Sequence, residues 1–209
     1  MSSGVPPPNA ITERIILPVK GGVDDWKEPY KQFLLTLKEQ PGFIRSRWGP
    51  RSENMGVLDL LTGWESPEAK QAFLEGEAHS RALDVMKGVL NGTPLTYSIK
   101  FKPYAPKDAI NAPIVEVITI SNCTGDENEL RAQVEKGYNL PGARSGASGF
   151  STSEVAGQGR IFVGVIGWDS IEASKAADKS YVPQGAGEVE IHHVNFLFPI
   201  KGFSVTNTN

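Results

Sequence analysis

The chain has 209 residues, a net charge of −3 and a pI near 5.7, with 39% hydrophobic and 22% charged residues. This composition is typical of a globular protein, and the weak negative charge argues against nucleic acid or acidic membranes as partners. The single cysteine excludes an intrachain disulfide, and no Cys/His cluster has the spacing of a zinc site. With no secretory signal and no apolar run of membrane-spanning length, we expect a cytoplasmic protein without a metal or cofactor.

The first half of the chain has the hydrophobic pattern of a β-α-β-β-α-β unit. Residues 1–10 are expected to be disordered, and the unit covers 11–102. Ser66 and Pro67 are a good N-cap and first residue for the second helix, which should break near Gly76. The predicted elements are strand 11–19, helix 24–40, strand 43–48, strand 57–63, helix 66–90 and strand 95–102.

The second half follows the same order after a linker over 103–113, which has three prolines and no periodicity. The second unit covers 114–203, and 204–209 is expected to be a flexible tail. Its predicted elements are strand 114–121, helix 127–138, strand 143–152, strand 160–167, helix 170–179 and strand 188–198.

The halves also repeat in sequence, at an offset near 104 residues. Gly63-Trp64-Glu65-Ser66 is matched by Gly167-Trp168-Asp169-Ser170, in each case between a strand and a helix. Two such units predict an α+β fold of two tandem ferredoxin-like repeats. Each sheet would have helices on one face and the sister sheet on the other, so the two sheets should close into one barrel-like core with the linker crossing outside.

These motifs resemble the dimeric α/β-barrel superfamily, in particular fungal proteins with antibiotic-biosynthesis-monooxygenase-like (ABM) or stress-responsive barrel domains. The resemblance rests on Gly-Trp-acid-Ser-x-Glu-Ala at 63–69 and 167–173, on the helices that follow, and on His192-His193-Val194. It implies an intramolecular dimeric α/β-barrel, a pseudo-dimer that is either monomeric or a homodimer. It leaves the reaction open, because the superfamily includes cofactor-free oxygenases, polyketide cyclases, haem-degrading enzymes, isomerases and proteins without an assigned activity.

Differences between the repeats point to a working site in the second one. Its strand 143–152 carries small residues such as Gly146 and Ser148 where the first repeat is bulky, and Ala177 stands where the first repeat has Phe73. The lost side-chain volume predicts a ligand cavity between sheet and helices. The alternative is a collapse of the helix, with filling by neighbouring phenylalanines and the linker.

His192 and His193 are the main catalytic candidates. Neighbours on a strand point to opposite faces, so at least one should line an interior. A neutral imidazole is the usual general acid or base near neutral pH, and the alternative is a core histidine bonded to the backbone. His79 is a third candidate, either facing a first-repeat pocket or lying at the surface.

Further candidates are residues expected to contact an apolar small-molecule substrate. They are Arg144, Gly146, Ser148, Tyr138, Ala177, Tyr181, Trp48 and Tyr97. Asp59 is either a general base or, as we expect, a partner of Arg14, Arg45 or Arg47. Trp64 and Trp168 should hold the strand-to-helix corners.

The absence of several sequence motifs excludes some classes of enzyme. The sequence has no phosphate-binding loop, dinucleotide fingerprint or nucleophile elbow. We therefore expect a cofactor-free enzyme of natural-product biosynthesis that cyclises or isomerises an apolar polyketide- or terpenoid-type intermediate, with a pericyclic ring closure included. The alternatives are a cofactor-independent ABM-type monooxygenase and a non-catalytic, stress-associated barrel protein that binds a small molecule or haem.

Overall fold

The computed structural model describes residues 7–104 and 106–199. The expected tail at 204–209 and most of the expected disordered N-terminus lie outside these residues. The elements of the first repeat are β1 (Ile11–Pro18), α1 (Val23–Lys38), β2 (Phe43–Arg51), β3 (Asn54–Trp64), α2 (Pro67–Glu75), α3 (Glu77–Lys87) and β4 (Leu95–Ile99). The predicted break is confirmed, because Gly76 ends α2 and precedes α3.

The second repeat follows a short linker helix, α4 (Lys107–Ile110). Its elements are β5 (Ile114–Ser121), α5 (Glu127–Glu135), η1 (Lys136–Asn139), β6 (Ala143–Phe150), β7 (Phe162–Trp168), α6 (Ile171–Ala176), η2 (Lys179–Tyr181) and β8 (Glu188–Val194). Both predicted helices of this repeat are shorter than expected, and each is followed by a 3₁₀ turn, η1 or η2.

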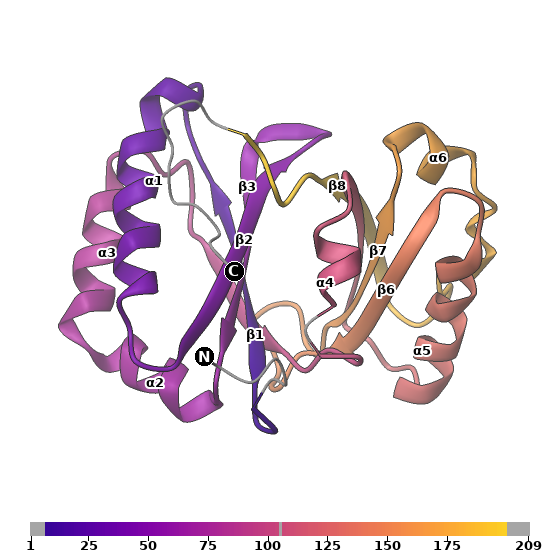
Figure 1. Cartoon of the computed structure of the whole chain (residues 1–209). Coiled ribbons are helices and arrows are strands. Elements are labelled where there is room, and N and C mark those ends of the chain that lie inside the picture. Colours follow the sequence, from indigo (N-terminus) through magenta and orange to yellow (C-terminus); the bar gives the residue numbers. More distant parts are fainter. Residues whose placement is uncertain (1–6, 105, 200–209) are drawn as a thin grey trace.

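The strands form one sheet in the order β4-β1-β3-β2-β8-β5-β7-β6. The two repeats use the same register, since Ile11 of β1 faces Trp64 of β3 and Ile114 of β5 faces Trp168 of β7. Figure 1 shows α1, α2 and α3 on the outer face of the first four strands and α5 and α6 on the outer face of the last four. The predicted α+β fold of two tandem ferredoxin-like repeats in one barrel is confirmed.

The two repeats meet at two contacts between strands, which we call the seams, and a glycine lies at each of them. At one seam Arg51 of β2 pairs with Val194 of β8, and a Cβ on Gly49 would lie 2.0 Å from the Asn195 carbonyl oxygen. At the other, the chain after β4 bonds to β6 through Lys102 and Ser148, and a Cβ on Gly149 would lie 2.2 Å from the carbonyl oxygen of Lys100. The absence of a side chain lets each pair of strands approach closely, so the sheet curls round until its two edges meet.

The linker runs inside the barrel, so the expectation that it crosses outside is wrong. Ala109 and Ala112 are fully buried, and Figure 1 shows α4 between the two halves of the sheet. A Cβ on Gly167 would meet the Ala109 carbonyl oxygen at 2.7 Å, so this glycine leaves space for the linker. Ala147 of β6 is also fully buried in the apolar cluster between the sheets, which includes Ile110 of α4. Small residues on the inner face of the second repeat therefore accommodate the linker.

Three apolar clusters form the core. One lies between the first sheet half and α1 to α3, one between the second half and its helices, and the third fills the barrel interior between the halves. Among the described residues, no helix is both long and apolar enough to cross a membrane.

Candidate functional site

His192 lies in the barrel interior, in a buried network of charged residues. Its Nε2 is 3.0 Å from Asp59 Oδ2 and 3.1 Å from Arg14 Nη2. Arg14 and Asp59 form a two-pronged ion pair, with contacts of 2.6 and 3.0 Å, which confirms the predicted pairing of Asp59 with Arg14. Burial alone would raise the pKa of Asp59, but the Arg14 charge and His192 hold it well below its usual range. Burial dominates at His192 and lowers its pKa, which favours the neutral ring.

The same network joins the two repeats. Arg14 donates to the Tyr97 hydroxyl and to Thr119 Oγ1 of the second repeat, both at 2.8 Å. Burial raises the pKa of Tyr97, against the opposing effect of Arg14. Because Arg14 and Asp59 are fully buried and bonded to each other, the network is a polar core that fixes how the repeats meet.

His193 points to the opposite face of β8, as strand alternation predicts. Its Nε2 is 2.9 Å from Ser174 Oγ of α6, and its Nδ1 is 2.6 Å from Glu53 Oε1 of the first repeat. Burial would lower the pKa of His193, but hydrogen bonds to Glu116 and Glu53 outweigh it and the pKa is raised. Both ring nitrogens are thus engaged by protein groups.

A buried carboxylate, Glu116, is the centre of the His193 cluster. It accepts hydrogen bonds from Ser174, from Tyr181 at 2.9 Å and from Lys179 at 2.5 Å. Burial opposes ionisation, but the bonds from His193, Lys179 and Ser174 lower the pKa of Glu116 to about 2. Since Ser174 is fully buried, its hydroxyl is not accessible as a nucleophile.

The first repeat has an equivalent buried carboxylate with different partners. Glu13 accepts from Trp64 Nε1 at 2.9 Å and lies 3.3 Å from Lys70 Nζ. Lys70 also donates to Ser98, which occupies the position of His193 in the other repeat. A buried carboxylate under the second helix is therefore common to both repeats, whereas the histidine belongs to one of them.

The space over Gly146 is filled. A Cβ at this glycine would fall 2.0 Å from the ring of Tyr138, so the predicted opening at this point of the second repeat is wrong. The alternative expectation, that neighbouring groups fill the space left by the small residues, describes this region. Tyr138 fills it on the helix side and the linker on the inner side. Burial raises the pKa of Tyr138 to about 12.

The other predicted contact residues are spread over several surfaces. Ser148 and Tyr181 are buried, Ala177 is half-buried, and Arg144 is exposed and pairs with Asp169 at 2.6 Å. Their proposed contact with substrate stays a prediction, as does the catalytic role of His192 and His193.

The first-repeat candidates do not surround one pocket. His79 is half-buried and packs edge-on against Phe73, with ring centres 5.2 Å apart. Trp48 is buried on the helix side, where it contacts Tyr30 at 4.7 Å between ring centres. Tyr97 lies in the barrel interior, on the opposite face of the sheet.

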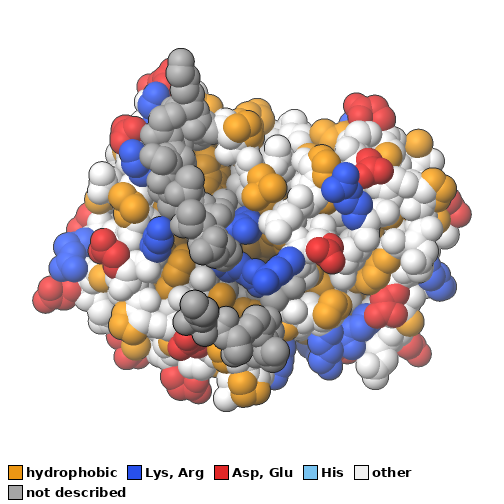
Figure 2. Space-filling view, in the orientation of Figure 1, with side chains coloured by type: hydrophobic (Ala, Val, Ile, Leu, Met, Phe, Trp, Pro, Cys, Tyr) orange, Lys and Arg blue, Asp and Glu red, His pale blue; other side chains and the backbone are white. Residues whose placement is uncertain are grey.

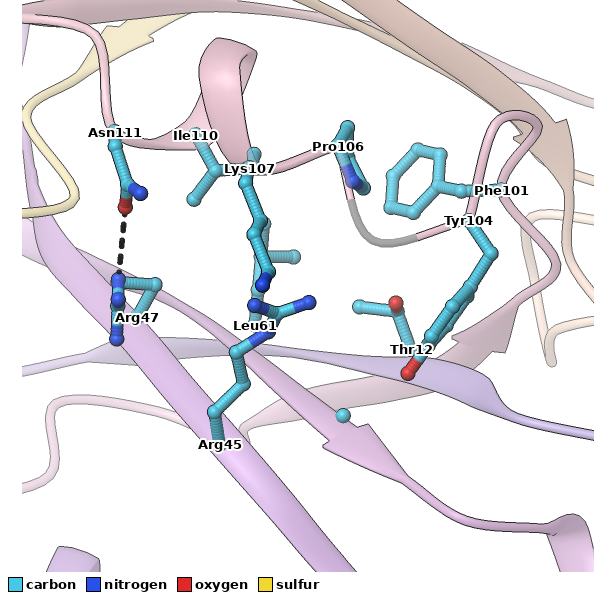
Figure 3. A pocket seen from close by; sticks show the side chains of 11 residues that line it. Thr12, Arg45, Arg47, Leu61, Phe101, Tyr104, Pro106, Lys107, Ile110 and Asn111 are labelled. Atoms are coloured by element: carbon cyan, nitrogen blue, oxygen red, sulfur yellow. Dashed lines mark hydrogen bonds between the residues drawn. The ribbon is translucent and has the colours of Figure 1, made fainter. Parts of the chain in front are cut away.

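A cavity opens at one end of the barrel, between the first sheet half and the linker helix α4. Its volume is about 40 Å³, and we call it the mouth cavity. Figure 3 shows Arg45, Arg47 and Lys107 reaching into the same space from β2 and α4. The lining residues are Thr12, Arg45, Arg47, Leu61, Gly63, Phe101, Tyr104, Pro106, Lys107, Ile110 and Asn111.

The charged side chains that line the mouth cavity are all cationic. None of the described residues that line it is acidic, and Arg45, Arg47 and Lys107 make no ion pair with a described residue. Arg47 Nε donates to Asn111 Oδ1 at 3.0 Å. Burial and the charge of Arg45 lower the pKa of Arg47. Figure 2 shows Lys and Arg side chains gathered near the middle of this face, where Figure 1 places the region between β2 and α4.

The second repeat lacks this cationic site. Arg45 and Arg47 pair with Gly63 and Leu61 in the sheet, and the corresponding partners of Gly167 and Val165 are Ser145 and Ala147. There the linker occupies the inner face, while on the first-repeat side the space stays open. The sequence carried a signal for this site, namely arginines at alternate positions of one strand, but we interpreted them only as partners for Asp59.

A second hollow is an open groove of about 530 Å³ between α2, the outer edge of β4 and residues 152–156. Its one cationic lining residue, Lys70, is already bound to Glu13 and Ser98. Among the described residues, the groove therefore offers no unpaired positive charge to a ligand. Among the described residues, no group of three or more His, Cys, Asp or Glu side chains is arranged to hold a metal ion.

Comparison with known proteins places the fold. No protein-family model and no curated protein matches the chain. The structure is similar to that of an anthrone oxidase-like protein, with a TM-score of 0.67, 14% identity, and coverage of 89% of this chain and 90% of the other. It is also similar to a candidate monooxygenase from Fusobacterium nucleatum subsp. nucleatum, with a TM-score of 0.61, 12% identity and coverage of 89% and 91%.

A candidate monooxygenase from Lactobacillus acidophilus NCFM has the same architecture, with a TM-score of 0.55, 8% identity and coverage of 89% and 93%. In each case the match extends over nearly the whole of both chains, so the two-repeat arrangement itself is shared. At these low identities the likeness establishes the fold, and the chemistry must be argued from the site.

Proposed function

We propose that this protein is a cofactor-independent oxygenase of the ABM type, which binds an enolisable or phenolic small molecule in the mouth cavity. The observation that carries the proposal is the lining of this cavity, in which Arg45, Arg47 and Lys107 meet apolar walls without a carboxylate among the described lining residues. Such a site favours a ligand with an anionic oxygen and an apolar body.

The cations supply the chemistry by stabilising negative charge on the substrate. An opposite charge within a few ångströms favours the ionised form of an acid, so a carbonyl compound or phenol bound here loses its proton more readily. The oxygen of the resulting enolate faces Arg45 and Arg47, while Leu61 and Ile110 contact the apolar part. No resident cofactor is needed, because the electrons come from the substrate carbanion.

The overall reaction balances with dioxygen as the oxidant. A methylene group next to the carbonyl loses a proton to solvent, and its carbanion forms a carbon–oxygen bond with O₂. The peroxide then loses water to leave a new ketone, so that R₂CH₂ + O₂ gives R₂C=O + H₂O. The roles of the protein are to hold the enolate and to orient the carbon that reacts.

The structural comparisons support the oxygenase over other enolate chemistry, because the similar proteins are named for anthrone oxidation and monooxygenation. Cyclisation or isomerisation of an apolar intermediate is the second candidate, because the same enolate would be stabilised by the same cations. In that reaction His193 or His192 would move the proton, although both rings are held by protein groups in this structure.

Oxygen consumption with anthrone and with simple 1,3-dicarbonyl compounds tests the proposal. We expect oxygen-dependent conversion by the wild-type protein, and a fall in kcat/KM of about 10²-fold in Arg45→Gln and Arg47→Gln, the scale for loss of an oxyanion donor. Arg81→Gln is the matched control, because Arg81 is an exposed arginine on α3. Conversion that proceeds equally without O₂ would favour cyclisation or isomerisation, and no conversion of any compound would contradict an enolate enzyme.

A further inference from the structure

The charge of the mouth cavity exceeds what one oxyanion requires. Arg45, Arg47 and Lys107 contribute three positive charges, and none of the described lining residues is acidic. Arg45 and Arg47 are half-buried. Burial and, to a smaller extent, repulsion from Arg45 lower the pKa of Arg47, so keeping these charges close together costs free energy. A ligand that has a carboxylate in addition to a phenolic or enolic oxygen would pair with more of this charge than the phenol or ketone alone.

The polar contacts of Arg47 prepare it for a planar anion. Its Nε is bound to Asn111 Oδ1 of the linker and its Nη1 to the Ser46 carbonyl, each at 3.0 Å. These contacts fix the plane of the guanidinium, while Nη2 makes no hydrogen bond to a described residue. A fixed guanidinium loses little side-chain entropy when it binds a carboxylate.

The opposite end of the cavity is aromatic. In Figure 3 the side chains of Phe101, Tyr104 and Pro106 lie together at one end, and those of Arg47 and Asn111 lie at the other. Gly63 forms part of the wall between the ends, since a Cβ there would lie 3.1 Å from the Tyr104 hydroxyl. The hydroxyls of Tyr104 and Thr12 add hydrogen-bonding groups to this aromatic end.

We propose that the ligand of the mouth cavity is an aromatic acid, with a carboxylate at the arginine end and a ring carrying an oxygen at the aromatic end. The proposal rests on the proposed function for the location of the site, and it adds the carboxylate as the recognition element. A 2-hydroxybenzoate has this chemistry in its simplest form: a carboxylate, an adjacent phenolic oxygen and one ring.

Calorimetric titration with 2-hydroxybenzoate and 2-hydroxybenzamide tests the inference. The two compounds have nearly the same shape and the same phenol, but only the first has a carboxylate. We expect the acid to bind at least 10-fold more tightly than the amide, with an affinity that falls as salt is raised. Arg47→Gln and Arg45→Gln should each weaken the acid about 10-fold or more while changing the amide little.

Two further variants separate binding in this cavity from binding elsewhere. Gly63→Ala adds a methyl group to the wall without removing a charge, so it should weaken the acid and the amide alike. Arg81→Gln should leave both unchanged, and circular dichroism confirms that each variant is folded. Equal affinity for acid and amide, or an acid affinity unaffected by both arginine changes, would overturn the inference.

The binding experiment and the oxygen-consumption experiment can fail independently of each other. Tight, arginine-dependent binding of 2-hydroxybenzoate without oxygen consumption by any substrate would keep the aromatic-acid site and refute the oxygenase. Oxygen consumption with anthrone and no preference for the acid would do the reverse.

Discussion

The two equivalent tryptophans test how much a hydrogen bond to a buried carboxylate stabilises this protein. Trp64 and Trp168 are both fully buried at matching corners of the two repeats. Trp64 Nε1 donates to Glu13 at 2.9 Å, whereas Trp168 Nε1 has no hydrogen-bond partner among the described residues. Substitution by Phe removes the indole N–H at both sites and keeps a six-membered ring, so the hydrogen bond is the main difference, besides the Lys179 ammonium that lies 5.5 Å from the Trp168 ring centre.

The magnitude follows from that difference. A hydrogen bond to a charged group contributes about 1.5–3 kcal/mol, and the loss of ring volume is common to both variants. We expect Trp64→Phe to lower the free energy of unfolding by about 1.5–3 kcal/mol more than Trp168→Phe does. The full truncations, Trp64→Ala and Trp168→Ala, should each cost roughly 3–5 kcal/mol, as for other large buried aromatics.

Urea unfolding followed by circular dichroism at pH 7 measures the difference, provided that the dependence on urea is the same in all variants. In a Glu13→Gln background, the extra cost of Trp64→Phe should shrink, because the charged acceptor is gone. Equal losses for Trp64→Phe and Trp168→Phe, within about 0.5 kcal/mol, would refute the reasoning.

Three further predictions concern other parts of the core, each measured by the free energy of unfolding. Asp59→Asn should cost about 3–5 kcal/mol, because it leaves the Arg14 charge buried without its partner; a cost below about 1 kcal/mol would contradict this. The pKa of Glu116 is lowered from 4.5 to about 2, so its ionised form stabilises the fold above pH 4.5. This stability, on the order of 3 kcal/mol, should be lost as the pH falls towards 2, and Glu116→Gln should lack that part of the pH dependence. Gly149→Ala should cost about 1–3 kcal/mol through the clash at the seam, while Gly88→Ala, where a Cβ meets nothing within 4 Å, should not.

Local signals in the sequence were sufficient to predict most elements. The strand-Gly-Trp corner, the Ser-Pro helix start and the break at Gly76 all depend on neighbouring residues, and the structure has each of them. Strand alternation alone placed His192 and His193 on opposite faces. The internal repeat then predicted that the two units pack against each other, because each must bury the second face of its sheet.

The candidate site could not be predicted from these signals, because it depends on where the linker lies. Four residues of α4 are too few to show helical periodicity, so no pattern in the sequence predicts Ala109 inside the barrel. The small residues of β6 indicated missing volume correctly, but not what fills it. The linker and Tyr138 do so in the second repeat, and the opening that remains lies beside Arg45 and Arg47 in the first.

A crystal structure with 2-hydroxybenzoate bound at pH 7 tests the central claim most directly, namely that the working site is the mouth cavity. We expect density for the ligand in that cavity, with its carboxylate against Arg45 and Arg47 and its ring towards Phe101 and Tyr104. Density beside His193, between the second half of the sheet and α6, would contradict the account and return the site to the second repeat.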